Sequence, residues 1–404
     1  MVSIPVLIVT AVIYSGPADQ AQLILPAVCV VIAYILFDNT SANFDGVFSA
    51  YRSGRDLFIG RFVQLAGFPL FAILLLPLGT SVGTLTIATI VAMVLALLVK
   101  VVLVRAYLIF RSSGPAVREG FRSLPDMLRF GAKVVPGQLI AGFADQASTW
   151  VLGAVAPISV VGAWSRSFAL AQRMNEAGYR ICEILYPTLM VRWKAGDFEG
   201  FNRALARTTR LTALGMFLIA AVVGGGSDGV LRIFGEGFEE AAGAFACLLF
   251  LMAITCVAMV LGQGILATGH PHQLTLAAAI RSVLALGLMI PGAIYGEALG
   301  AAIGLTFATV VQIVLMIAMM VRFVGRTSLP PLRFAAVLAA ATAIGFSLTR
   351  VIDLAFPGIV GLAIAMAVGG VAYGLIAFVL GLQDDERRMM LGKARSILHR
   401  GHPA

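Results

Sequence analysis

The sequence predicts an all-α polytopic membrane protein, on the evidence of its composition, its long apolar segments and the lack of an alternating strand pattern. Of its 404 residues, 60% are hydrophobic and 12% are charged, whereas soluble globular domains are about 45–50% apolar. Apolar windows of about 17–25 residues, the length that crosses a bilayer as a helix, recur along the chain. The segments of about ten residues with alternating hydrophobicity that build a membrane barrel are not seen.

The apolar windows predict about twelve transmembrane helices, the first of them short. They cover residues 2–15, 20–37, 57–78, 84–108, 134–155, 157–190, 207–227, 240–268, 273–295, 297–323, 333–352 and 357–382.

Lys and Arg in the connections predict the orientation. Basic connections alternate with basic-poor ones, the weak point being the turn around His270 and His272, which has neither Lys nor Arg. Because basic loops stay on the cytoplasmic side, both termini are expected in the cytoplasm and the protein in the cell (inner or plasma) membrane. The net charge of +9 is read as this orientation signal facing anionic lipid, and not as a nucleic-acid surface.

The longest internal connection, about residues 110–133, predicts a boundary between two helical lobes. It is punctuated by Gly and Pro and carries apolar side chains able to rest on the membrane surface. A sparse repeat supports the division, because AYRSGRDL (50–57) aligns without gaps with ATGHPHQL (267–274). We therefore expect an N-terminal lobe with a cytoplasmic linker (1–131), a C-terminal lobe (132–325), and two further spans with a basic tail (326–404).

Segment 157–190 is apolar enough to span a bilayer and yet charged along one side. At 100° per residue, an arc of about 100° holds Arg166, Arg173, Glu176, Arg180 and Glu183. Charges within a membrane normally point into protein or a water-filled cavity, which makes a transport pathway the default hypothesis. The alternative is a stripe that neutralises itself, since Arg173, Glu176, Arg180 and Glu183 have the spacing of helix neighbours. Arg166 has no carboxylate within one turn of its helix.

Three other charged residues are candidates for the same pathway. Asp145 and Arg166 lie on consecutive antiparallel helices, each at about 15 Å below the outer surface. They are expected either to pair structurally or to form a substrate or coupling site in which Arg166 meets phosphate. Arg281 and Arg61 are further cations within or beside their spans, and either is long enough to reach the interface. Arginines outnumber carboxylates in this set, which favours an anionic substrate because guanidinium groups match phosphate oxygens.

The order of several weak motifs resembles one family of membrane proteins. The segment LIAGFADQASTWVLGAVAPISVVGAWSRSFALAQR, continued by EILYPTLMVRWKAGD, resembles the seventh and eighth transmembrane helices of the MOP superfamily, in particular Wzx-type polysaccharide flippases. RIFGEGFEEAAGAFACLLF resembles the external turn of that family, and LATGHPHQL with GEALGAAIG resembles its later glycine signatures.

The resemblance implies a two-lobed MOP/MATE-like bundle with a partial N-lobe, because four spans precede helix 134–155 where six are expected. It implies a non-enzymatic transporter that moves a polyprenyl-diphosphate-linked oligosaccharide from the cytoplasmic to the outer leaflet by alternating access. The implied partners are this lipid-linked substrate, membrane lipid and polysaccharide-assembly proteins, with no nucleic acid. No cofactor, catalytic residue or metal ligand is expected.

Three other functions stay open at this point. A cation-coupled multidrug exporter of the same fold would need a more acidic cavity. A membrane enzyme acting on polyprenyl lipids, such as an O-antigen polymerase or glycosyltransferase, would need a catalytic loop, yet no D-x-D motif is present. A scaffold that binds lipid-linked precursors or partner enzymes without transport is the third alternative.

Overall fold

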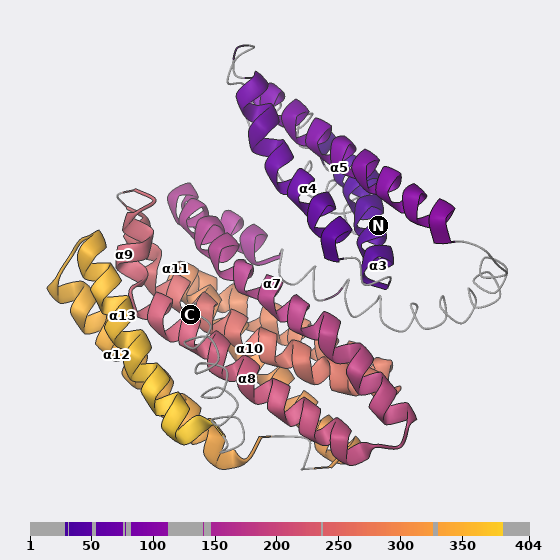
Figure 1. The fold of residues 1–404 in the computed structure, drawn as a ribbon. Coiled ribbons are helices and arrows are strands. Elements are labelled where there is room, and N and C mark those ends of the chain that lie inside the picture. The colour runs from indigo at the N-terminus through magenta and orange to yellow at the C-terminus, as the bar shows by residue number, and fades with distance from the viewer. Residues whose placement is uncertain are drawn as a thin grey trace, which may run out of the picture. The chain divides into compact units, whose positions relative to one another are not determined.

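The described part of the chain is helical, with no strand in it, as the computed structural model in Figure 1 shows. The structure describes residues 29–30, 32–50, 54–75, 77, 82–111, 140, 147–235, 237–325 and 330–382. Within these residues, seven helical segments are long and apolar enough to cross a membrane. The predicted class, an all-α polytopic membrane protein, is confirmed. Window 2–15 and most of windows 20–37 and 134–155 lie outside the described residues.

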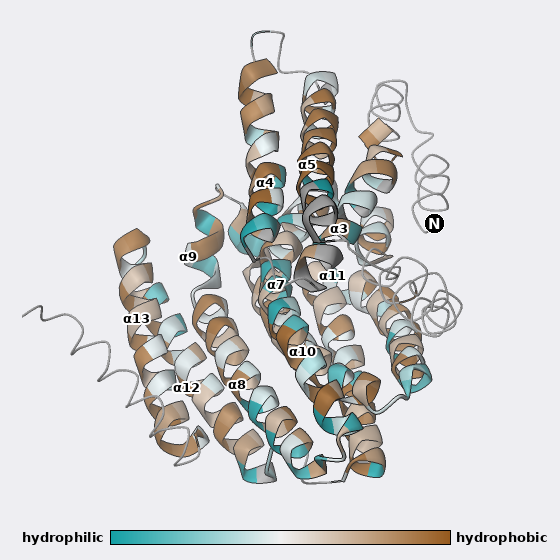
Figure 2. Ribbon diagram, turned by 45° about the vertical axis from the view of Figure 1, so that its right-hand side comes forward, coloured by the Kyte–Doolittle hydropathy of each residue, from teal (hydrophilic) through white to brown (hydrophobic). Residues whose placement is uncertain are grey.

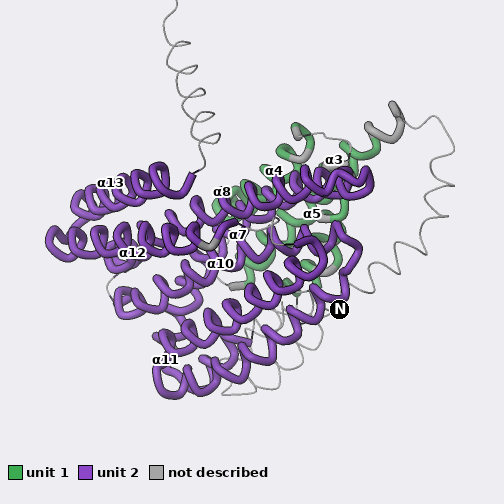
Figure 3. Tube along the Cα trace, turned by 90° about the horizontal axis from the view of Figure 1, so that it is seen from below, with its two compact units in different colours: residues 1–126 green, residues 127–404 purple. Residues whose placement is uncertain are grey.

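The chain divides into two compact units, Met1–Asp126 and Met127–Ala404, coloured separately in Figure 3. Each unit is described by itself below. The three-part division expected from the sequence, with boundaries after residues 131 and 325, stays a prediction.

The first unit packs three long helices together with a short π-helical segment. Its elements are η1 (Tyr34–Asp38), α3 (Asn39–Ala50), α4 (Gly54–Leu75) and α5 (Val82–Arg111). Helices α4 and α5 approach closely, since a Cβ on Gly67 would be only 3.2 Å from the Cβ of Ala92. Small residues such as these let membrane helices pack at short distance. The predicted windows 20–37 and 57–78 leave residues 38–56 outside a span, whereas the helix that includes η1 continues to Ala50 and α4 already begins at Gly54.

The second unit is organised around α10 (Ala242–Ala267), which packs against α7 (Ile158–Lys194), α8 (Phe198–Gly225) and α11 (Pro271–Phe323). Helix α10 is apolar all round, as expected of a helix enclosed by others, and Leu248, Ala253 and Cys256 are fully buried. The short elements α9 (Ser227–Arg232) and η3 (Phe238–Ala241) join α8 to α10.

The last helices of the described chain belong to the second unit. Helix α12 (Leu332–Ala355) packs against α8 and α13 (Ile359–Ile376), and α13 continues into η5 (Ala377–Gly381). The Tyr373 hydroxyl donates a hydrogen bond to the carbonyl oxygen of Leu214 at 2.8 Å. At one end, Arg350 of α12 pairs with Asp228 of α9. These contacts fix the final hairpin to α8 and α9.

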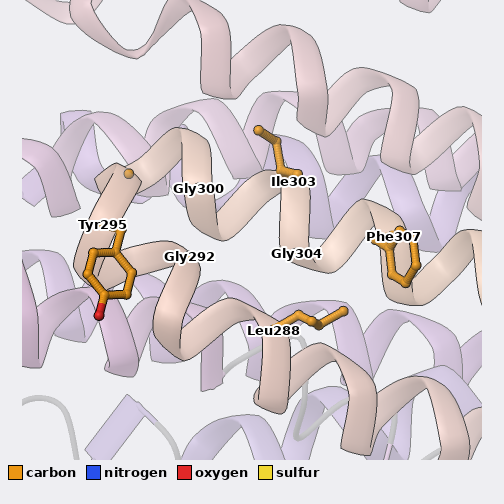
Figure 4. Close-up of a pocket in the computed structure, with 8 residues that line it drawn as sticks. Leu288, Gly292, Tyr295, Gly300, Ile303, Gly304 and Phe307 are labelled. Carbon is orange, nitrogen blue, oxygen red and sulfur yellow. The ribbon is translucent and has the colours of Figure 1, made fainter.

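Helix α11 is two antiparallel helices joined by a reversal, as the adjoining windows 273–295 and 297–323 predict. The backbone leaves the helical region at Gly296 and at Glu297, whose φ is 47°. A Cβ on Gly300 would lie 2.0 Å from the carbonyl oxygen of Gly292, so the two halves can approach this closely only without side chains. Figure 4 shows the open, apolar groove of about 460 Å³ that these halves form, with Tyr295 and Phe307 at its edge.

Candidate substrate pathway

Helix α7 is held in the second unit by one apolar side. It begins after Pro157 and ends before Gly196, whose φ is 73°. Over 37 residues it measures about 55 Å, at about 1.5 Å per residue. The side facing the core includes Trp164, which is fully buried and stacks on Phe168.

The opposite side is the charged face of α7, which we define as Arg166, Arg173, Glu176, Arg180 and Glu183. Four of these residues are exposed and Arg180 is half-buried, and Figure 2 shows hydrophilic positions along this helix. From Arg166 to Glu183 the face extends for about 26 Å along the axis. That length is comparable to the roughly 30 Å thickness of a bilayer's hydrocarbon core.

The charges of this face are partly paired with one another. Arg173 contacts Glu176 at 2.7 Å, and Arg180 contacts Glu183 at 2.9 Å. This is the self-neutralising pattern that helix spacing allowed. Such exposed pairs contribute little to stability, typically about 0–1 kcal/mol, so they do not explain why the charges are there.

Arg166 differs from the other arginines of the face. It is exposed and makes no ion pair or hydrogen bond with any residue that the structure describes. Its expected partner Asp145 lies outside the described residues, so the pair stays a prediction. A charge at the bilayer centre costs about 2.5–3.5 kcal/mol on insertion scales. We therefore expect the charged face of α7 to contact water or protein and not lipid.

The water contact of this face can be measured with thiol chemistry. In a background with Cys29, Cys182, Cys247 and Cys256 replaced by serine, Gln172→Cys should react with a charged, membrane-impermeant thiol reagent. Gln172 is exposed and borders the charged face. Val283→Cys is the matched control, an apolar position that is 71% exposed. Because the hydrated thiolate is the reactive form, we expect labelling at residue 172 to be at least about tenfold faster. Equal rates would mean that α7 turns this side to lipid.

Arg281 is held inside the second unit. Its side chain is buried, and its Nε donates a hydrogen bond to the Thr309 hydroxyl at 3.2 Å. The adjacent Ser282 hydroxyl contacts the carbonyl oxygen of Ile140 at 3.3 Å. Arg281 thus joins the two halves of α11 through its hydrogen bond to Thr309.

A second group of charges lies in the first unit and includes Arg61. The carboxylate of Asp45 contacts the Lys100 ammonium group at 2.8 Å and the Nε of Arg61 at 3.4 Å. One turn along α4 from Arg61, the Gln64 amide donates to the Asp38 carboxylate. We call Asp38, Asp45, Arg61, Gln64 and Lys100 the three-helix polar cluster, since η1 and α3, α4 and α5 each contribute to it.

Sequence reasoning identified Arg61 but missed Asp38, Asp45 and Lys100. The two aspartates fall in DNTSANFDG, which looked like part of a connection because it is polar and contains Asn and Gly. Their spacing of seven residues, which places both on one helix face, was the available signal. Lys100 lies inside the predicted span 84–108 and was not singled out.

Comparisons with known proteins agree with the architecture. No protein-family model matches the chain, and a search of curated proteins finds no match. Among solved structures, the chain is similar to one described as a lipid II flippase MurJ in an inward closed conformation. The TM-score is 0.59 at 12% sequence identity, with 93% of this chain and 80% of that chain covered. At this identity the similarity establishes the fold alone, a multi-helix bundle like that of the MurJ structure.

Proposed function

We propose that this chain is a transporter that translocates a lipid-linked oligosaccharide, carried on a polyprenyl diphosphate, from the cytoplasmic to the outer leaflet by alternating access. The observation that carries the proposal is the charged face of α7, where Arg166 has no counter-ion among the described residues. A guanidinium group without a counter-ion suits a phosphate group, because phosphate oxygens can accept two parallel hydrogen bonds from it.

The balance of charge on α7 favours an anionic cargo over a cationic drug. Both glutamates of the face are already paired, Glu176 with Arg173 and Glu183 with Arg180. Arg166 is left as the surplus charge among the described residues of that face. A multidrug exporter for cations needs a surplus of negative charge, so we rank it below the flippase.

Two further observations support a lipid-linked cargo. The similar solved structure is named a lipid II flippase, a protein that by its name moves a lipid between leaflets. The sequence resemblance to Wzx-type flippases adds the oligosaccharide. In this proposal both termini lie in the cytoplasm, polysaccharide-assembly proteins are the partners, and the chain itself is not an enzyme.

Loss of the gene tests this proposal directly. In a deletion strain, a lipid-linked oligosaccharide should accumulate in the cytoplasmic leaflet, because the transporter that empties that pool is missing. The measurement is the amount and leaflet of the lipid-linked intermediates, compared with a strain carrying the gene on a plasmid. Unchanged intermediates together with altered drug resistance would instead establish the multidrug exporter.

A further inference from the structure

The apolar groove of α11 follows the seam between the two halves of that helix (Figure 4). Its walls are Leu288, Tyr295, Ile303 and Phe307, and four glycines form the rest of its lining. None of these residues is charged, and the groove has a volume of about 460 Å³. The stretch from Gly300 to Phe307 corresponds to about 10 Å along the helix axis. Because membrane helices tilt only about 20° from the bilayer normal on average, the groove runs in the direction of the lipid chains.

The glycines of this seam serve the contact within the hairpin. A Cβ on Gly300 would lie 2.0 Å from the carbonyl oxygen of Gly292, and one on Gly304 would lie 2.9 Å from backbone atoms of Leu288. The other side of the hairpin packs on α10, and Ala301 is fully buried there. On the outer side the glycines leave a hollow between the larger side chains of the walls.

One end of the groove is marked by polar groups at the reversal of α11. Tyr295 is 90% exposed, and tyrosine is enriched where the bilayer meets water. Glu297 is exposed and makes no ion pair with a described residue. The turn IYGEALG has neither Lys nor Arg, which is typical of the outer side of the membrane. A carboxylate without a counter-ion thus stands beside the mouth of an apolar groove.

From this geometry we propose that the α11 groove binds one phospholipid with a primary ammonium head group, of which phosphatidylethanolamine is the type. One acyl chain lies in the groove and the ammonium group pairs with the Glu297 carboxylate. The Tyr295 hydroxyl donates to the phosphate. Hydrocarbon must fill the hollow in a bilayer, because an empty one forfeits dispersion contacts with its lining, and the carboxylate selects which lipid supplies the chain.

A second copy of the chain fits the groove less well than an acyl chain does. A helix about 10 Å in diameter and about 10 Å long occupies roughly 800 Å³, which is more than the groove of about 460 Å³ offers. Glycines four residues apart are a common contact between separate membrane helices, but Gly292 and Gly300 already contact each other within the hairpin. A flexible chain without side groups can follow the hollow that remains.

Native mass spectrometry of the purified, delipidated full-length protein tests the proposal. The probes are phosphatidylethanolamine and phosphatidylglycerol with identical acyl chains. The wild type should bind one phosphatidylethanolamine more tightly than phosphatidylglycerol, by at least about threefold. Glu297→Gln should remove this preference, because the contribution of one exposed ion pair, up to about 1 kcal/mol, corresponds to about fivefold. Glu240→Gln is the matched control, an exposed carboxylate outside the groove, and should keep the preference.

Filling the groove provides the second arm. Gly296→Leu adds a side chain to the lining, whereas Gly287→Leu makes the same change on the same half of α11 outside the groove. A Cβ at either position would meet no atom within 4 Å, so both variants should fold. Gly296→Leu should weaken phosphatidylethanolamine binding by about tenfold as dispersion contacts are lost, and Gly287→Leu should not. Ile303→Trp, from the opposite wall, should repeat the loss.

Several results would overturn the proposal. Equal binding of the two lipids by the wild type would remove the selection by Glu297, and equal binding by the two leucine variants would remove the groove. Displacement of phosphatidylethanolamine by a polyprenyl phosphate would assign the groove to a polyprenyl chain. A dimer that is lost in Gly296→Leu would assign it to a second copy. None of these measurements involves transport, so they are independent of the proposed function.

Discussion

Replacing Arg166 by alanine should reduce export of the lipid-linked substrate by about 10- to 100-fold while leaving the protein folded and inserted. A hydrogen bond to a charged group contributes about 1.5–3 kcal/mol, which corresponds to this range. Arg166 is exposed and has no ion pair or hydrogen bond with a described residue, so its removal should not unfold the helix bundle. The measurement is the rate of substrate appearance in the outer leaflet, normalised to the amount of protein in the membrane.

Two companion variants separate the roles of charge and shape at this position. Arg166→Lys keeps the charge but loses the planar fork, and should give an intermediate rate. Arg203→Ala, which removes an exposed arginine of α8 paired with Glu199, should export normally. If Arg166→Ala and Asp145→Ala both disappear from the membrane, the two residues form a structural pair and the assignment of Arg166 to the pathway is wrong.

The variant Asp45→Asn should be strongly destabilised, by about 3–5 kcal/mol in the free energy of unfolding, because it removes the carboxylate that contacts the buried Lys100. Asp38→Asn should cost much less, because the Asp38 carboxylate accepts its hydrogen bond from Gln64. Adding Lys100→Met to Asp45→Asn should recover most of the loss, because the buried charge is then gone. The measurement is unfolding of the purified protein by a denaturing detergent.

The exposed pair of Glu199 and Arg203 provides the control for this series. Neutralising it should change the free energy of unfolding by less than about 1 kcal/mol. An Asp45→Asn change that costs no more than this control would show that the buried Lys100 does not depend on Asp45.

Much of the fold follows from local sequence, but the polar cluster does not. The reversal within α11 was predicted because the apolar run is interrupted by YGEALG, and the structure places it at Gly296 and Glu297. The charged face of α7 was predicted because charges three and four residues apart must share a helix side. By contrast, Asp45 and Lys100 are far apart in sequence, and no periodicity within one helix reveals that they meet.

The surroundings of single side chains also could not be predicted from the sequence. Arg281 and Arg61 looked alike as cations near the ends of spans, yet Arg281 is buried against Thr309 and Arg61 pairs with Asp45. The Lys100 side chain fits against α4 because residue 60 is a glycine. Such a fit depends on the side chains of two helices at once.

The sequence by itself determined that this chain is a bundle of membrane helices with one amphipathic, arginine-bearing helix, because hydrophobic length and helix periodicity are properties of contiguous residues. Only the tertiary structure decided which charges are paired, which are left exposed and where a lysine is enclosed beside an aspartate. Those outcomes depend on how separate helices pack, and the free energy of a charge in a membrane protein is set by the neighbours that packing brings to it.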